Sequence, residues 1–192
     1  AGFKDTFLIF PGERVRVLYR GAWGFAASSV LSAGEVRRVT DLAIEVATAS
    51  ARLTSDPVRL CPEPVHRETV VTPCRIDPFA VPLEEKTALL LETMERLHAQ
   101  AGVARSSAGL WFRRDRKIFA SSEGTRLEFD LLASQGECEA RAVSDGRFAS
   151  RSYTTPHLRR GYELIHEAAF TTEASRVAVQ AVEKVKAPQV EA

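Results

Sequence analysis

The chain has 192 residues, and its 26 basic and 25 acidic side chains leave a formal net charge of +1. Hydrophobic residues make up 45% of it and charged residues 27%, a composition typical of folded globular proteins rather than disordered or fibrous ones. The near-neutral balance argues against a nucleic-acid partner, and no stretch approaches the ~20 apolar residues that span a membrane.

The length allows one domain or two small ones, at roughly 150 residues per domain. Cys61, Cys74 and Cys138 are an odd number of thiols at irregular spacing, so at least one of them is unpaired within the chain. Free thiols suit a reducing compartment. We therefore expect a cytoplasmic protein.

The first predicted element is a β-hairpin. Val15, Val17 and Tyr19 alternate with arginines, which is the period of a half-buried strand. Residues 21–24 contain turn-compatible glycines, and residues 25–28 are predicted to form the returning strand.

A helix is predicted over residues 32–53. Ser32 and Glu35 form a capping-box pattern, in which each side chain can bind the other residue's free backbone N–H. The expected buried stripe consists of Val36, Val39, Ala43, Val46, Ser50 and Leu53.

Residues 54–82 form a predicted connector. They hold six of the chain's nine prolines, which remove backbone donors and discourage long regular structure. Residues 58–60 and 69–71 are the two short extended pieces that are candidates to join a sheet edge.

A second helix is predicted from Pro82 to Ala101. Proline suits the first turn of a helix, Glu84 and Glu85 complement its dipole, and Gly102 ends it. Its expected buried stripe consists of Leu83, Leu90, Met94, Leu97 and Ala101.

Residues 103–155 are predicted to form an antiparallel meander of about four or five strands, because the spacings between apolar runs are too short for crossover helices. The turn signals are Arg114-Asp115, Glu123-Gly124, Gln135-Gly136 and Asp145-Gly146.

A last helix is predicted from a cap at Thr172 to Pro188, with Ala174, Ala178, Ala181 and Val185 on its buried face. The expected fold class is α+β, with antiparallel β-sheets and helices packed on one face in two layers. We expect one domain over residues 1–80, a hairpin-helix unit plus the connector. The second domain, 81–192, comprises helix, meander and last helix.

His166-Glu167 is the dipeptide that opens a zinc-peptidase motif, in which a second histidine completes the metal site. That histidine is missing, because positions 170 and 171 are Phe170 and Thr171. We therefore expect a structural or surface role for the pair.

The other candidate ligands are dispersed: His66, His98 and His157 fall in different predicted elements, and the spacing of Cys61 and Cys74 about His66 matches no common zinc pattern. The sequence contains no Gly-x-Ser-x-Gly elbow and no phosphate-binding glycine loop of the P-loop type. No catalytic, cofactor-binding or metal-binding residue is predicted.

A basic and aromatic stretch lies in the predicted meander. It consists of Trp111, Phe112, Arg113, Arg114, Arg116 and Lys117. Such a stretch can bind nucleic acid, but a charged hairpin turn explains it equally well, and the net charge of +1 favours the turn.

Residues 12–26 end in Gly-Ala-Trp-Gly-Phe-Ala after a valine-rich strand, and this segment resembles the amino-terminal signature of the TldD/PmbA family of metallopeptidases. Further similarities are Asp77-Pro78-Phe79 before Pro82-Leu83-Glu84-Glu85-Lys86, Ser121-Ser122-Glu123-Gly124, and Gly161-Tyr162-Glu163. The resemblance spans nearly all of the chain.

The resemblance implies a bacterial or archaeal parent enzyme, with zinc as its cofactor, that cleaves peptides or unfolded segments. Its His-Glu-x-x-x-His motif and cysteine ligand would lie beyond Ala192, so His166-Glu167 is not their counterpart. Family members usually have further strand and helix sequence before the hairpin, which suggests that the amino end is trimmed.

We therefore expect an inactive, amino-terminal part of such an enzyme that shapes the substrate cleft and mediates contact in a homo- or hetero-dimer. Trp23 is either an exposed contact residue of that surface or, slightly favoured, a core residue beside two glycines. The alternatives are a region of a non-catalytic partner subunit and a stand-alone peptide-binding module.

Overall fold

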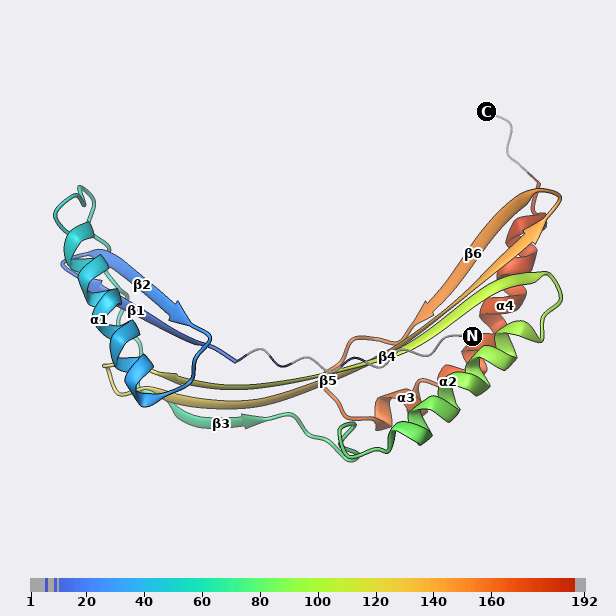
Figure 1. Cartoon of the computed structure of the whole chain (residues 1–192), viewed down its shortest axis with the longest axis horizontal. Helices are drawn as coiled ribbons and strands as arrows, with labels where there is room; N and C mark the ends of the chain where they lie inside the picture. The colour runs from blue at the N-terminus through green and yellow to red at the C-terminus, as the bar shows by residue number, and fades with distance from the viewer. Residues whose placement is uncertain (1–5, 7–8, 10, 189–192) are drawn as a thin grey trace. The chain divides into compact units, whose positions relative to one another are not determined.

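A computed structural model describes residues 6, 9 and 11–188 (Figure 1). The two chain ends, on which the expectation of a longer parent rests, lie outside the described residues. Contacts between Cα atoms divide the chain into two compact units, Ala1–Pro64 and Val65–Ala192. The break between the units falls inside the proline-rich connector.

The first unit is a β-hairpin covered by one helix. Strands β1 (Glu13–Tyr19) and β2 (Ala22–Ser28) pair antiparallel, and α1 (Ala33–Ser50) packs on them. The turn is Arg20-Gly21, both with positive φ, so the expected turn over 21–24 is wrong and β2 begins earlier. Two residues suffice because their twist matches that of the flanking strands.

Ser32 caps α1 as expected, since its hydroxyl accepts a hydrogen bond from the Glu35 N–H at 3.1 Å. The buried stripe differs from the expected one and consists of Val39, Ala43 and Ala47, while Val36, Val46 and Leu53 are exposed. The buried residues Ala43 and Ala47 are small because α1 lies very close to Gly24 of β2. A Cβ added there would overlap the Ala43 carbonyl oxygen and the Ala47 nitrogen, so this part of β2 touches the helix backbone.

The connector contributes one strand to the second unit. β3 (Arg67–Val71) pairs in parallel with β5 (Arg126–Ser144), which confirms the edge piece expected at 69–71. Residues 58–60 form no strand, although the Val58 N–H donates to the Gly21 carbonyl at 2.9 Å.

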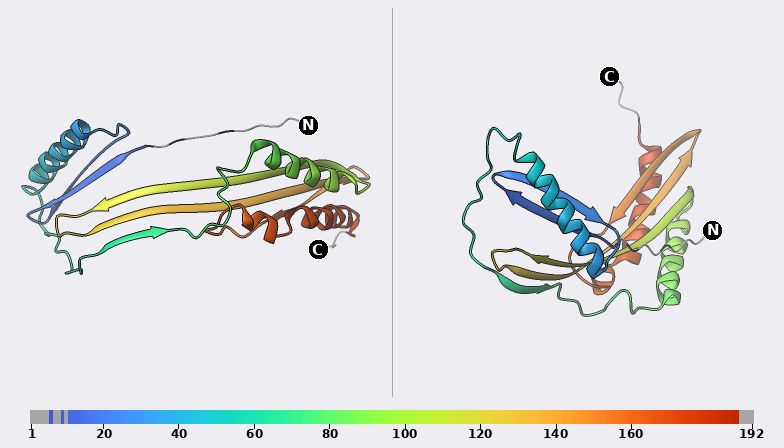
Figure 2. Two further views of the ribbon diagram at one scale, coloured as in Figure 1. Left: turned by 90° about the horizontal axis from the view of Figure 1, so that it is seen from below. Right: turned by 60° about the vertical axis from the view of Figure 1, so that its left-hand side comes forward.

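The second unit is built on a four-stranded sheet of three antiparallel strands and the parallel strand β3. β5 is central, β4 (Val103–Ala120) pairs along its whole length, and β6 (Arg147–Thr154) joins β5 beyond β3 (Figures 1 and 2). The expected antiparallel meander is confirmed, but it has three strands instead of four or five. Turns do form at Glu123-Gly124, within residues 121–125, and at Asp145-Gly146.

The two false turn signals have physical explanations. Arg114 and Asp115 lie inside β4, where the Arg114 guanidinium is neutralised by Asp130 of the paired strand. Gly136 lies inside β5, where an added Cβ would come within 3.2 Å of the Phe170 ring. Gly136 therefore leaves space for the Phe170 ring and does not mark a turn.

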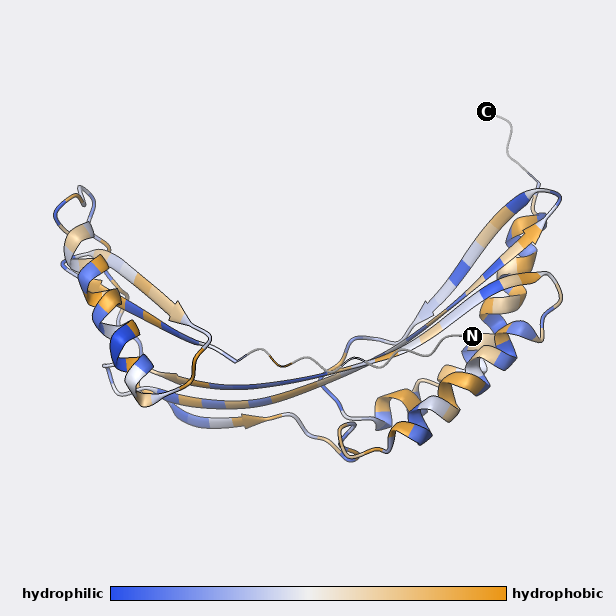
Figure 3. Ribbon diagram, in the orientation of Figure 1, coloured by the Kyte–Doolittle hydropathy of each residue, from blue (hydrophilic) through white to orange (hydrophobic). Residues whose placement is uncertain are grey.

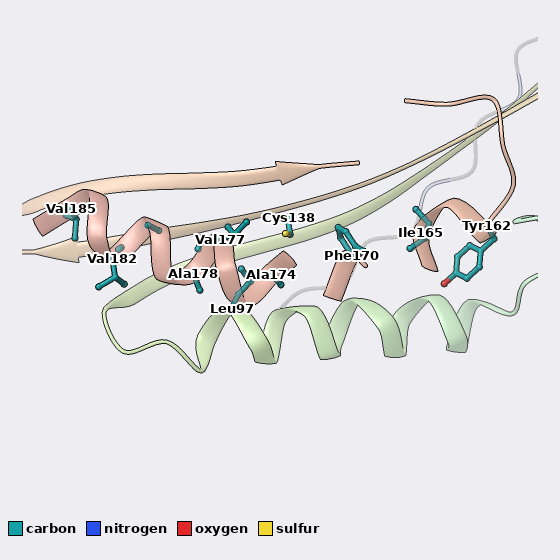
Figure 4. Close-up of a cluster of buried hydrophobic side chains, with 13 residues drawn as sticks. Leu97, Cys138, Tyr162, Ile165, Phe170, Ala174, Val177, Ala178, Val182 and Val185 are labelled. Atoms are coloured by element: carbon teal, nitrogen blue, oxygen red, sulfur yellow. The ribbon is translucent and has the colours of Figure 1, made fainter. Parts of the chain in front are cut away.

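The helices α2 (Leu83–His98) and α4 (Phe170–Lys186) pack side by side on one face of the strands, and the short α3 (Glu163–Glu167) precedes α4. Figure 4 shows the core between them, and hydrophobic and hydrophilic residues alternate along the long strands in Figure 3. The buried core residues are Leu97, Cys138, Ala140, Ala142, Tyr162, Ile165, Phe170, Ala174, Val177, Ala178, Ala181, Val182 and Val185.

The last helix begins at Phe170 after the left-handed residue Ala169, so the cap expected at Thr172 is wrong. Its expected buried face is confirmed. The α+β class is confirmed as well, with a small antiparallel sheet and a mixed one. Among the described residues, no helix is both long and apolar enough to cross a membrane.

Candidate functional site

A hollow of about 430 Å³ opens in the second unit where the chain leaves β3 and turns toward α2. It is lined by Val71, Thr72, Pro73, Cys74, Arg75, Asp77, Arg114, Asp130 and Leu132. The loop over residues 72–80 forms one wall, and β4 and β5 form the other. We call this loop the 72–80 loop.

Arg114 fastens the 72–80 loop to the sheet. Its guanidinium donates to both carboxylate oxygens of Asp130 at 2.7 and 2.9 Å, and to the Asp77 carboxylate at 2.9 Å. These hydrogen bonds to Arg114 lower the pKa of Asp130, and the two carboxylates raise the pKa of Arg114. The fork of a guanidinium suits such a two-sided bridge.

Glu163 fastens the same loop from the other side. Its carboxylate is buried and accepts the backbone N–H groups of Ile76 and Gly161, each at 3.1 Å. The Tyr162 N–H in turn donates to the Ile76 carbonyl at 2.8 Å. Burial alone would raise the pKa of Glu163, but the backbone donors outweigh it and lower the pKa.

A second charge cluster lies at the end of α3. Glu167 accepts from Arg160 at 2.5 and 2.9 Å and pairs with Arg75 of the 72–80 loop. The hydrogen bonds from Arg160 lower the pKa of Glu167. A carboxylate held ionised by two guanidiniums is a weak proton acceptor, so this site positions the loop rather than moving protons.

Glu163→Gln is expected to destabilise the second unit by about 2 kcal/mol at neutral pH, because hydrogen bonds to a charged group are lost. The folded-state pKa of Glu163 is lowered from its ordinary value of 4.5, so its stabilisation is complete above that value. It disappears as the pH falls through the lowered pKa. The difference between the two proteins should therefore shrink in acid.

Urea unfolding across a pH series, followed by Trp111 fluorescence in a Trp23→Phe background, measures this effect. Glu92→Gln is the matched control, because Glu92 is half-exposed and pairs with Arg96 within one helix at 2.8 Å. Its loss should cost at most about 0.5 kcal/mol. A Glu163→Gln deficit that stays constant down to strongly acid pH would contradict the assignment.

His166 and Glu167 contact neighbouring side chains of the second unit. The His166 ring lies edge-on to Tyr162 with centroids 5.1 Å apart, Glu167 is engaged by arginines, and Phe170 is buried in the core. In the described part of the chain, no group of three histidine, cysteine, aspartate or glutamate residues lies close enough to hold a metal ion. These side chains do not fit the zinc ion that the resemblance implies for the parent.

The remaining candidates stay apart. His66 lies 3.4 Å from Glu68, and His98 and His157 are exposed elsewhere in the second unit. The cysteines divide in the same way. Cys61 belongs to the first unit, Cys74 lies in the 72–80 loop, and Cys138 is buried in β5, where burial raises its thiol pKa to about 11.

The basic and aromatic stretch is not a hairpin turn, because it lies in the middle of β4. Its residues alternate between faces: Phe112 packs toward Tyr162 at a ring distance of 5.7 Å, whereas Trp111 is 63% exposed. Arg113 pairs with Asp115 at 3.0 Å. Since Arg114 is also neutralised, acidic partners offset much of the positive charge of the stretch.

Trp23 is half-buried on the face of the hairpin opposite α1, so the favoured expectation of a core residue is wrong. The Arg16 guanidinium lies 4.3 Å from the centroid of its ring. The small residues beside it, Ala22, Gly24 and Ala26, occupy the core instead. This alternation explains why glycine and alanine flank the tryptophan.

Sequence reasoning missed the roles of Asp77, Arg114, Asp130 and Glu163. Asp77 and Glu163 stand inside two of the strings on which the family resemblance rests, so a signal existed for them. Nothing in the local pattern indicated that residues 87 positions apart, Ile76 and Glu163, would bind one another.

Comparison with known proteins agrees with that resemblance. The profile of a family described as the PmbA/TldA metallopeptidase central domain matches residues 76–187, more than half of the chain. Metalloprotease MJ0996 of Methanocaldococcus jannaschii is 26% identical over 122 residues, which cover 62% of this chain and 26% of that protein.

A crystal structure from Thermotoga maritima, described as that of a candidate modulator of a DNA gyrase, matches 92% of this chain with a TM-score of 0.66. The sequences are 16% identical, so this likeness shows a shared fold. The chain spans 39% of that structure and about a quarter of the curated relative.

Proposed function

Because the chain belongs to the TldD/PmbA family of metallopeptidases, we propose that it is a non-catalytic part of such an enzyme, which shapes the substrate cleft and the contacts between subunits. The matched profile is that of the family's central domain, over residues 76–187. The substrates are peptides or unfolded segments, and zinc is held by residues outside this chain. We also propose a cytoplasmic location and a homo- or hetero-dimeric parent.

The proposed role in holding substrate rests on the long edge of β4 that no described strand covers. β4 pairs with β5 on one side from Val103 to Ala120, and no described strand pairs with its other side. A strand edge offers a row of backbone donors and acceptors that can hold an extended peptide whatever its side chains. Holding a peptide bond in one extended geometry would present it to a hydrolytic centre elsewhere in the parent enzyme.

The anchored 72–80 loop supports the same role. Arg114 and Glu163 tie it to the sheet and to the segment before α3, so the framework beside β4 and β5 is fixed from two sides. A rigid frame lowers the entropy lost when a flexible substrate binds.

Calorimetry with uncharged unfolded peptides and no added metal tests this function. The chain should bind a peptide and its scrambled version equally well, because backbone groups carry the recognition. A peptide N-methylated at every residue loses the backbone donors of both its edges and should bind at least about tenfold more weakly.

The matched control is a peptide methylated at every second residue, which can still turn its unmethylated edge to β4 and should bind about as well as the unmethylated peptide. Equal binding by the fully methylated peptide and this control would contradict edge recognition, as would strong dependence on side-chain order. A partner subunit without the metal motif and a stand-alone binding module remain the alternatives. The parent's sequence after Ala192 separates the first of them from the proposed enzyme.

A further inference from the structure

Two arginines stand directly opposite each other on the face of the second sheet that the helices leave open. Arg105 of β4 and Arg141 of β5 are Cα partners in the ladder, which places their Cβ atoms roughly 5 Å apart. Both side chains point away from the core, because the neighbouring β5 residues Ala140 and Ala142 are buried under the helices. Like charges in such a pair repel each other.

The repulsion is poorly compensated. Arg141 approaches the Glu139 carboxylate at 3.4 Å, a long contact, and Arg105 makes no ion pair or hydrogen bond with any side chain in the described part of the chain. The two guanidiniums line an open hollow of about 280 Å³ together with Ser106, Ser107 and Glu139. An anion placed there would relieve the repulsion and find the Ser107 hydroxyl beside it, whereas the Ser106 hydroxyl donates to Met94 on the helix side.

The charges continue in a pattern along the same face. Glu139 lies two residues from Arg141 on β5, and Glu137 lies two residues further, opposite Gly109. Successive residues on one face of a strand are about 6.8 Å apart. Along β5, the Arg105–Arg141 pair is thus followed by Glu139 and then by Glu137. Their spacing matches that of alternate side chains in an extended polypeptide.

We propose that this open face binds an extended polypeptide segment that carries an acidic residue and, two positions later, a basic one. The acidic side chain binds between Arg105 and Arg141, and the basic side chain reaches Glu139. The order of charges on this face favours such a segment over a free anion, because a free anion would pair with the arginines but not with Glu137 and Glu139. The inference does not rest on the proposed function, because the open face is distinct from the edge of β4.

Titration of the chain with two short peptides of identical composition tests this surface. One peptide carries a single Glu-Ser-Lys unit flanked by serines, so that both charges share a face when it is extended. The other carries a single Glu-Lys-Ser unit with the same flanks, which places the two charges on opposite faces. The first should bind at least about threefold more tightly, and Arg105→Gln or Arg141→Gln should each abolish that preference.

Arg113→Gln is the matched control, because Arg113 lies on the same strand and face but is neutralised by Asp115. It should retain the preference. Circular dichroism confirms that each variant is folded, and the comparison of the two peptides on the unmodified chain needs no variant at all. Equal binding of the two peptides would overturn the proposal, as would inorganic phosphate binding as tightly as the better peptide, which would indicate a simple anion site.

Discussion

Gly24→Ala is expected to cost the first unit about 3 kcal/mol of stability. The added Cβ would overlap the Ala43 carbonyl oxygen and the Ala47 nitrogen, and backbone atoms of a helix cannot move aside as a side chain can. A unit of about 64 residues has only a few kcal/mol to lose. Urea unfolding followed by Trp23 fluorescence, in a Trp111→Phe background, measures the loss.

Gly34→Ala provides the matched control. It introduces the same methyl group into the same unit, but Gly34 lies in the first turn of α1 with nothing within 4 Å of the added atom. Alanine favours a helix over glycine, so this variant should gain about 0.5–1 kcal/mol. If Gly24→Ala unfolded at the same urea concentration as Gly34→Ala, the close approach of β2 to α1 would be wrong.

Phe170→Ala is expected to cost the second unit about 3–5 kcal/mol. The Phe170 ring is buried at the start of α4 and packs against Gly136 of β5, so its removal leaves a cavity between the helix and the sheet. Because position 170 is also where a zinc motif opened by His166 would need its second histidine, the variant tests the structural role assigned to that segment.

Phe148→Ala removes the same group from a residue that is 75% exposed on β6. It should change stability by less than about 1 kcal/mol. Urea unfolding of both variants, followed by Trp111 fluorescence in a Trp23→Phe background, gives the comparison. Equal losses in the two variants would show that Phe170 does not anchor α4.

Local signals predicted much of the fold. The period-two pattern of Val15 and Val17, the cap at Ser32 and the pair Asp145-Gly146 each depend on neighbouring residues, and each prediction is confirmed. The face of the last helix that includes Ala174 and Ala178 is likewise confirmed. The strand, the helix cap, the turn and the helix face could be predicted because each depends on residues close together in the sequence.

Long-range packing explains the failures. The local pattern at Arg114-Asp115 predicts a turn, but Asp130 of the paired strand neutralises Arg114 and the segment is a strand. The local pattern at Gly136 also predicts a turn, but the glycine is needed because the Phe170 ring packs against it. The Glu163 carboxylate could not be assigned a role, because its donors come from a segment 87 residues away and from its own loop. The candidate site is made almost entirely of such contacts.

We propose that this chain supports a hydrolytic centre whose metal ligands lie elsewhere in the parent enzyme. The most direct test is to supply zinc to the isolated chain and measure both the metal retained after dialysis and the cleavage of an unfolded peptide, with the Methanocaldococcus jannaschii metalloprotease as the positive control. We predict no stoichiometric zinc and no zinc-dependent cleavage. One bound zinc per chain together with zinc-dependent cleavage would contradict the claim.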